Sequence, residues 1–350
     1  MNTKIKLLTL LEGACGKSIS GESIAAELGV SRAAVWKAVN ALKRDGCIIE
    51  GVQNRGYRLT GGVLNADAIL PYLKFPARIN RVRVFPVLES TNKTAKETAV
   101  SGAYAVGEND DGNRFFPVVI IADTQTAGRG RLGRSFYSPA GTGLYMSFIL
   151  RPEYIALPQI NSVTVYAAAA VCKAIKTVCG AECGIKWVND IFLNGKKICG
   201  ILTEAVSDLE SASVEHIILG IGINVATTNF PEDLASVAGA IFPQSDVKQS
   251  YNAELTSNTA ASDIFIGNMR KRLAAELINI FDGAYPEFTF ESALAEYCGR
   301  MLFRGKTVTV SKADAKFDAE VVGIDAVGRL TVKKSDGAIE NLLSGEIILR

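Results

Sequence analysis

Hydrophobic positions in residues 1–62 recur with the spacing of two short helices and a hairpin. Gly29 and Val30 interrupt this pattern and predict a turn, and Ser31 is a good N-cap for the helix that follows. Alternating apolar positions in 47–50 and 57–59 then predict two paired strands. The apolar stripes of the two helices are Ile24 and Leu28, then Val35, Val39 and Leu42. This combination is typical of a winged helix-turn-helix.

Residues 65–300 alternate between strand and helix patterns, which predicts a domain with a mixed sheet and helices on one of its faces. The dipeptide Asn194-Gly195 favours a type I′ turn between two of the strands. Two polar stretches, 108–114 and 243–262, are predicted to be loop insertions. The expected strands are 81–87, 118–121, 144–150, 185–193, 197–204 and 217–225, and the expected helices are 92–99 and 162–178.

From Gly305 onward the helical spacing disappears and short alternating runs remain. Separated by turn dipeptides, these runs predict a small SH3-like β-barrel of about five strands. We therefore expect an α+β protein of three domains, spanning 1–62, 65–300 and 302–350.

The composition indicates the general class of protein, but it does not identify a reaction. The 350 residues are 48% hydrophobic and 21% charged, as in ordinary globular proteins. No run approaches 18 apolar residues and no signal-peptide cleavage site follows the first helix, so a cytoplasmic location without a membrane span is expected. Seven cysteines without a Cys-x-x-Cys pair agree with reduced thiols. A single histidine, His216, argues against a His-based triad or a multi-His metal site.

Charge is unevenly distributed along the chain. Residues 1–60 carry nine Lys or Arg and five Asp or Glu, a net +4, so the remainder carries −2. A basic head on a mildly acidic body favours a polyanionic partner, and we interpret the head as DNA-binding. A small helical module for protein interaction is the alternative. The candidate DNA contacts are Ser31, Arg32, Trp36, Lys37 and Asn40 on the second helix, and Arg55 near the hairpin tip.

The segment 122–136 is the richest in candidate chemistry. It interleaves three glycines with three arginines directly after a predicted strand, and we call residues 128–134 the Gly/Arg tract. Glycine lets the backbone come close to a ligand, and guanidinium groups offer forked donors to carboxylate or phosphate. No Gly-Lys-Ser/Thr follows the tract at the spacing that a phosphate loop requires. Because Gln125 and Phe136 flank the tract, we expect an anchored anion-binding loop rather than a flexible basic surface loop.

Four further segments combine polar groups with strand or helix ends. Ser90-Thr91-Asn92 opens a helix, where hydroxyls also serve as caps. Lys186-Trp-Val-Asn-Asp190 ends a strand in an amide and a carboxylate, which suits a turn, a base edge or a metal ion. Lys197 lies on an apolar strand, where a cation is costly unless it meets an anion. Gly220-Ile-Gly-Ile-Asn224 places two glycines inside a strand, where a ligand can approach.

In this order and on this framework, the five segments resemble the biotin-protein ligase family. With the helix-turn-helix head, the chain resembles the bifunctional members, which combine ligase and biotin-operon repressor. Two positions depart from the family pattern: Val188 stands where proline is usual, and Phe136 where tryptophan is usual.

The resemblance implies that MgATP activates biotin to biotinyl-adenylate, with release of pyrophosphate. Biotin then passes to one lysine of a biotin carboxyl carrier protein, and a ligand-promoted homodimer binds operator DNA. The resemblance assigns catalytic roles to Lys197 and Arg131, and the metal ligands stay open. It implies biotin contacts for Ser90, Thr91, Asn92, Gln125, Arg129, Gly130, Arg131 and Lys197. It implies nucleotide contacts for Arg134, Phe136, Asn189, Asp190 and Asn224.

Two alternatives remain open at this stage. A lipoate-protein ligase resembles this family in fold, but the polar set Ser90, Thr91 and Gln125 favours the biotin ring. A metabolite-sensing repressor without ligase chemistry is the second alternative. Retention of Lys197 and of the three tract arginines favours an active ligase.

Overall fold

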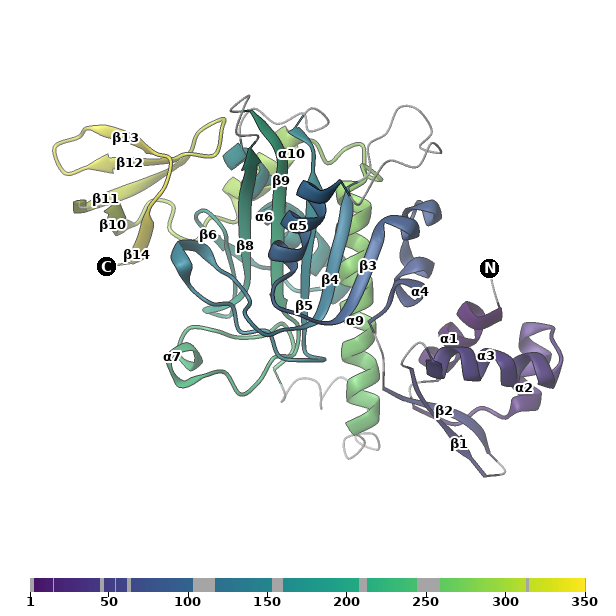
Figure 1. The fold of residues 1–350 in the computed structure, drawn as a ribbon. Coiled ribbons are helices and arrows are strands. Elements are labelled where there is room, and N and C mark those ends of the chain that lie inside the picture. Colours follow the sequence, from purple (N-terminus) through teal and green to yellow (C-terminus); the bar gives the residue numbers. More distant parts are fainter. Residues whose placement is uncertain are drawn as a thin grey trace.

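The computed structural model describes most of the chain as three consecutive bodies (Figure 1). The predicted insertion 108–114 lies outside the described residues, as does 244–258 within the second predicted insertion. The residues that the structure describes are 3–14, 16–44, 47–53, 55–61, 64–102, 117–152, 160–207, 213–243, 259–312 and 315–349.

The predicted winged helix-turn-helix is confirmed in the N-terminal body. Ser31 caps the last helix, because its Oγ accepts a hydrogen bond from Ala34 N at 3.2 Å. Gly29 ends the preceding helix with a φ of 64°, a left-handed conformation that glycine adopts without steric cost. The elements are α1 (Thr3–Gly13), α2 (Gly21–Leu28), α3 (Arg32–Arg44), β1 (Ile48–Val52) and β2 (Gly56–Gly61).

A seven-stranded mixed sheet forms the central body, in the order β3-β4-β5-β9-β8-β7-β6. β3 and β4 are parallel, and the other neighbours are antiparallel. The strands are β3 (Val82–Leu88), β4 (Val118–Gln125), β5 (Gly143–Leu150), β6 (Gly184–Lys186), β7 (Asp190–Leu193), β8 (Lys196–Ser207) and β9 (Val214–Asn224). The predicted type I′ turn has both required positive φ angles, 51° at Asn194 and 75° at Gly195.

The single strand predicted for 185–193 was wrong. Residues 187–189 form a turn between β6 and β7, and Ile185 pairs with Ile191 across it. The segment therefore forms two short strands of a tight hairpin, and the polar residue Asn189 lies in the turn between them. The turn carries Asn189 to the edge of the cavity described below.

Helices cover both faces of the central sheet, so the prediction of helices on one face was also wrong. Met146 and Phe148 of β5 belong to the core under α6 (Ile160–Cys179) and α9 (Thr259–Phe281). Ile149 of the same strand packs on the opposite face with Ala95 and Ala99 of α5 (Thr91–Ser101). Side chains alternate along a strand, and the sequence pattern did not assign α5 to the second face.

The two long C-terminal helices of the central body, α9 and α10 (Phe290–Gly299), are absent from the sequence-based prediction. The first turn of α9 also takes up 259–262, which had been assigned to the second insertion. Much of α9 is enclosed, with Leu273, Leu277 and Ile278 fully buried, so it has no clear polar stripe to mark it as a helix. α6 is long and apolar enough to cross a membrane, but 67% of its most apolar window is buried, as in a core helix.

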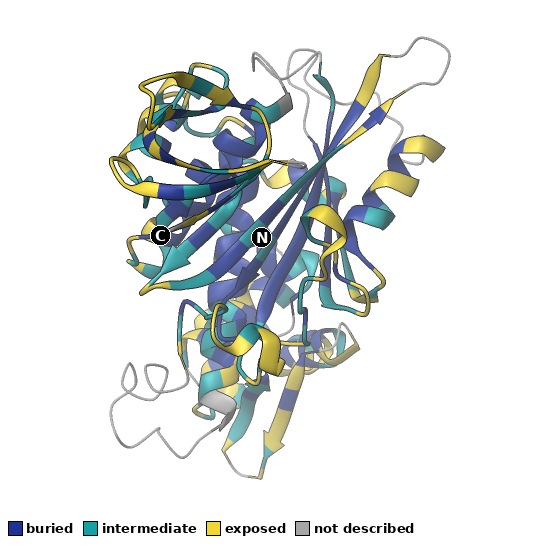
Figure 2. Ribbon diagram, turned by 90° about the vertical axis from the view of Figure 1, so that its left-hand side faces the viewer, coloured by how far each residue is buried: buried dark blue, intermediate teal, exposed yellow. Residues whose placement is uncertain are grey.

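The C-terminal body is an antiparallel sheet of five strands in the order β13-β12-β11-β10-β14. Figure 2 shows that this sheet is curved. Its inner face, including Val308, Val321 and Val332, is continuous with the core of the central body. The strands are β10 (Thr307–Lys312), β11 (Ala315–Ile324), β12 (Leu330–Lys334), β13 (Ile339–Leu342) and β14 (Glu346–Leu349). The remaining short helices are α4 (Ala66–Ile69), η1 (Leu70–Tyr72), η2 (Pro76–Arg81), η3 (Arg131–Gly133) and α7 (Glu232–Ala235).

Candidate active site

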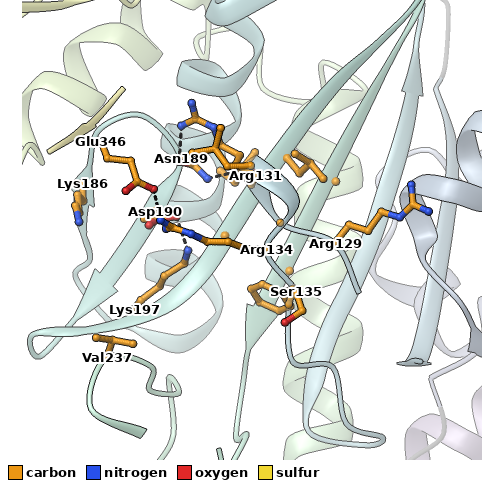
Figure 3. A pocket seen from close by; sticks show the side chains of 18 of the residues that line it. Arg129, Arg131, Arg134, Ser135, Lys186, Asn189, Asp190, Lys197, Val237 and Glu346 are labelled. Carbon is orange, nitrogen blue, oxygen red and sulfur yellow. Dashed lines mark hydrogen bonds and ion pairs between the residues drawn. The ribbon is translucent and has the colours of Figure 1, made fainter. Parts of the chain in front are cut away.

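A cavity of about 580 Å³ lies where the ends of β4, β8 and β9 meet the Gly/Arg tract and the C-terminal sheet (Figure 3). Twelve of the thirteen residues with a predicted ligand role line it. They are Ser90, Thr91, Asn92, Gln125, Arg129, Gly130, Arg131, Arg134, Phe136, Asn189, Asp190 and Lys197. Segments far apart in the sequence are thus brought to one place.

Asn224 is the exception among the predicted ligand contacts. It ends β9, is buried, and does not line the cavity. Among the described residues, its Oδ1 has no hydrogen-bond partner. The structure therefore gives no direct geometric support for a nucleotide contact at Asn224.

Polar groups at the start of α5 form one side of the cavity, which we call the polar floor: Ser90, Thr91, Asn92 and Gln125. Parallel pairing of β3 and β4 sets Leu88 beside Gln125, so the helix that follows β3 begins next to that side chain. Gln125 Oε1 accepts from Thr91 N at 2.8 Å, and Gln125 Nε2 donates to Ser138 Oγ at 2.8 Å. Ser90 is the N-cap residue of α5, but its side chain makes no capping hydrogen bond. Its hydroxyl is therefore not used to cap the start of the helix.

The Gly/Arg tract is a closed loop that returns to its own start. Phe136 N donates to Gly128 O at 2.8 Å, and Gly130 N donates to Arg134 O at 2.7 Å. A Cβ at Gly128 would lie 2.4 Å from Phe136 O, so only glycine permits this closure. The tract is therefore held at both ends, as expected. Leu132 at its tip is 76% exposed.

Three cations of the cavity, Lys197, Arg134 and Arg131, have acceptors from the protein itself. Lys197 Nζ lies 2.6 Å from Asp190 Oδ1, and Arg134 Nη2 lies 2.6 Å from Glu346 Oε1 of β14. Arg131 Nη1 donates to Asn189 Oδ1 at 3.0 Å.

Arg129 differs from the other three cations in its position. It points away from them (Figure 3), and its Nη2 lies 3.6 Å from Glu89 Oε1. The hydrogen bond from Lys93 holds the pKa of the Glu89 carboxyl below its ordinary value. An incoming anion would therefore meet Arg131, Arg134 and Lys197 as a group, at the cost of their present partners.

The glycines of β9 make room for side chains of the protein itself. A Cβ at Gly220 would lie 2.1 Å from Asn92 Oδ1, and one at Gly222 would lie 2.7 Å from the Phe136 ring. The two glycines within the strand pattern predict the approach of a ligand, whereas Asn92 and Phe136 occupy that space in the structure. Phe136 is thereby held against the strand at the edge of the cavity.

Sequence reasoning missed several residues of the site. Ser147 of β5 is fully buried beside the polar floor, and a hydroxyl inside the apolar run 144–150 was the available signal. Glu204 of β8 accepts from Asn92 Nδ2 at 2.7 Å. The C-terminal sheet contributes Glu346 to the lining, and the segment after α7 contributes Val237. No local pattern connects these distant segments to the cavity.

The predicted DNA contacts lie on the surface of the head. Arg32, Lys37 and the 60%-exposed Trp36 project from α3, and Asn40 is half-buried on the same helix. Arg55 is exposed in the turn of the β1–β2 hairpin. The side chain of Ser31 is used as a helix cap. The other predicted residues lie where they can contact a groove of DNA and its flanking phosphates.

Fold and cavity together define a class: an α+β ligase domain that gathers cations around a polar floor, with a helix-turn-helix head and a C-terminal β domain. Three family models match the corresponding parts of the chain. They are described as "HTH domain" at 3–58, "Biotin/lipoate A/B protein ligase family" at 112–224 and "Biotin protein ligase C terminal domain" at 303–350.

Comparisons with individual proteins agree with this class. The bifunctional ligase/repressor BirA of Escherichia coli is 30% identical, over 99% of this chain and 97% of its own length. The BirA of Bacillus subtilis is 40% identical, over 67% of this chain and 69% of its own. A solved biotin protein ligase of Aquifex aeolicus, in complex with biotin and ATP, is 26% identical with a TM-score of 0.52, covering 77% of this chain and 98% of that one. The chain belongs to the family of bifunctional biotin-protein ligase/repressors.

Proposed function

We propose that this protein is an ATP-dependent biotin-[acetyl-CoA-carboxylase] ligase that also acts as a biotin-responsive transcriptional repressor. The observation that carries the proposal is the cavity itself, where a neutral polar floor faces Arg131, Arg134 and Lys197. A ligand with a polar ring at one end and a carboxylate at the other fits that division. Family membership places the same two activities in relatives of this chain.

In the first step, the polar floor binds the ureido ring and the cations bind the charged groups. Ser90, Thr91, Asn92 and Gln125 are the ring contacts, and Arg129 with Gly130 encloses the chain of the ligand. A carboxylate oxygen of biotin attacks the α-phosphorus of ATP, a P–O bond forms, and pyrophosphate leaves. Lys197 and Arg131 offset the repulsion between carboxylate and phosphate, which is the main obstacle to this reaction.

Nucleotide recognition falls to the other side of the cavity. Arg134 and Asn189 offer donors, and the Phe136 ring, held over Gly222, offers a face for stacking with adenine. The shielded cavity keeps water from the mixed anhydride. In the second step the amine of a carrier-protein lysine attacks the acyl carbon, an amide forms, and AMP leaves. The nucleophile comes from the partner, so the chemistry needs no histidine of this chain.

Mg²⁺ is the proposed cofactor, and the residues present fit it. Magnesium is bound in nucleotide sites through one or two carboxylates together with phosphate oxygens and water. Asp190 supplies a carboxylate in the cavity wall. Within the described ranges, no cluster of three or more His, Cys, Asp or Glu side chains forms an all-protein metal site. Asp190 would hold the ion, which neutralises phosphate charge when bound.

The repressor activity is proposed for the head, with domain bounds of 1–62, 65–300 and 302–350. Two heads in a homodimer formed on binding adenylate would present two α3 helices at a fixed separation, so the operator would be a palindrome with half-sites spaced by whole helical turns. The proposed compartment is the cytoplasm. Lipoate ligase chemistry is the second candidate, because one family model covers both ligands. The hydrogen-bonding groups of the polar floor favour biotin, since a dithiolane ring offers no N–H.

Adenylation is tested by pyrophosphate release from labelled ATP, with biotin, with lipoate and with neither. Release that depends on biotin alone supports the proposal. Release with lipoate alone would show that the protein is a lipoate ligase and not a biotin ligase. No release with either acid would refute ligase activity.

DNA recognition is tested by selection from a random duplex pool in the presence of biotin and ATP. We expect a palindrome, a lower affinity for Lys37→Ala, and a salt slope smaller by about one. Lys96→Ala, on the exposed side of α5, is the control. No enriched sequence, or an affinity indifferent to both ligand and protein concentration, would contradict a ligand-regulated dimeric repressor.

A further inference from the structure

A chain of hydrogen bonds runs from Glu204 to the polar floor. Asn92 Nδ2 donates to Glu204 Oε2 at 2.7 Å and lies 3.3 Å from Leu202 O. Ser147 Oγ lies 2.6 Å from Asn92 Oδ1 and 2.8 Å from Thr91 Oγ1. Thr91 Oγ1 in turn lies 3.2 Å from Gln125 Oε1. Ser147 is fully buried, and Thr91 and Asn92 are nearly so, which leaves these groups few partners besides one another.

The carboxylate at one end decides the direction of this chain. A carboxylate and a backbone carbonyl accept hydrogen bonds and cannot donate, so the Asn92 amide must turn its nitrogen toward Glu204 and Leu202. Its oxygen then faces Ser147. Because an amide oxygen only accepts, the single Ser147 proton goes to Asn92 and not to Thr91.

The same reasoning fixes the proton of Thr91. The Thr91 hydroxyl can donate to Ser147 Oγ or to Gln125 Oε1, and both are internal acceptors. In either case its lone pairs are left as acceptors for a ligand in the cavity. With the Asn92 amide reversed, Ser147 would donate to Thr91 and occupy one of those lone pairs.

We propose that Glu204 is a positioning residue that makes Thr91 a hydrogen-bond acceptor and so selects ligands with a ring N–H, such as cyclic ureas. The inference deepens the proposed ligase function and rests on it. It assigns to Glu204 a role in recognition without contact to the ligand. Gly220 supports the arrangement, because any Cβ there would displace the Asn92 oxygen.

The test changes the chemical groups at the two ends of the Glu204–Asn92 hydrogen bond, first one at a time and then together. Glu204→Met removes the closer of the two acceptors and leaves Asn92 only the longer contact to Leu202 O at 3.3 Å. Asn92→Asp sets two carboxylates against each other, and their repulsion displaces the acceptor of the Ser147 proton. The double variant Glu204→Gln/Asn92→Asp reverses the 204–92 bond, because an amide at 204 donates to a carboxylate at 92. It keeps the direction of the Ser147 bond, because that carboxylate still accepts from Ser147. Glu215→Met, at an exposed position of β9, is the matched control.

Binding of biotin and of dethiobiotin, which keeps the cyclic urea, is measured by calorimetry with the full-length variants. We expect each single variant to weaken both ligands about tenfold, the equivalent of one net hydrogen bond. The double variant should return both to within about threefold of the parent, a difference below one hydrogen bond. The KM for ATP, the turnover number at saturating biotin and the melting temperature should stay unchanged in Glu204→Met, which separates recognition from a general loss of structure.

Two results would overturn the role of Glu204. One is parent-like biotin affinity in Glu204→Met, and the other is a double variant no tighter than Asn92→Asp. Failure of the parent protein itself to bind biotin would instead refute the proposed function, so the two failures are distinguishable.

Discussion

Replacement of Lys197 by methionine separates the catalytic role of this lysine from any role in stability. Lys197 is 34% exposed and its ion pair with Asp190 is screened by solvent. A pair of this kind contributes about 0–1 kcal/mol to folding. Methionine keeps the length of the side chain and its packing beside Gly200. The variant should therefore fold with a melting temperature close to that of the parent.

The effect on chemistry should be much larger. If Lys197 stabilises the charge that develops between carboxylate and α-phosphate, its loss removes an anion contact of about 3 kcal/mol, or about a hundredfold in rate. The contact is stronger in catalysis than in folding because bound substrates exclude water from the cavity.

Single-turnover adenylation with labelled ATP and saturating biotin measures this step directly. Lys196→Met is the control, since the neighbouring Nζ donates to Ser236 O at 2.6 Å and does not line the cavity. We expect the control to adenylate at the parental rate. A Lys197→Met protein that adenylates within about threefold of the parent, a barrier change below 1 kcal/mol, would refute the assigned role.

Three other substitutions test separate parts of the structure. Arg131→Gly should release biotinyl-adenylate early and label nearby lysines without selectivity; acceptor-specific labelling at the parental level would contradict its retaining role. Gly222→Ala should displace the Phe136 ring and raise the ATP KM about tenfold while the biotin KM is unchanged, and an unchanged ATP KM would exclude that ring from the nucleotide site. Arg78→Met should destabilise the central body by about 3–5 kcal/mol in thermal unfolding, because both it and Asp282 are 1% exposed and the carboxylate would lose its partner. If Arg78→Met/Asp282→Leu is no more stable than the single variant, the buried carboxylate that has lost Arg78 is not the cause.

The sequence alone determined the local features of this protein. Helical spacing around Val35, a cap at Ser31 and the Asn194-Gly195 turn depend on neighbouring residues only, and the structure confirms all three. The Gly/Arg tract was recognisable for the same reason, since its glycines and arginines act through the chemistry of one continuous segment. The order of this tract and the four other segments along the chain was enough to identify the family.

The tertiary structure decided what these segments do for one another. In 185–193 the polar pair Asn189-Asp190 suited a turn among other roles, and only the pairing of β6 with β7 shows that the chain reverses there. Nothing local to Glu204 connects it with Asn92, 112 positions away in the chain. Likewise, Glu346 reaches Arg134 only because the C-terminal sheet packs against the central core. Propensity and periodicity are properties of short segments, whereas the direction of a hydrogen bond and the partner of a charge depend on which segments the fold brings together.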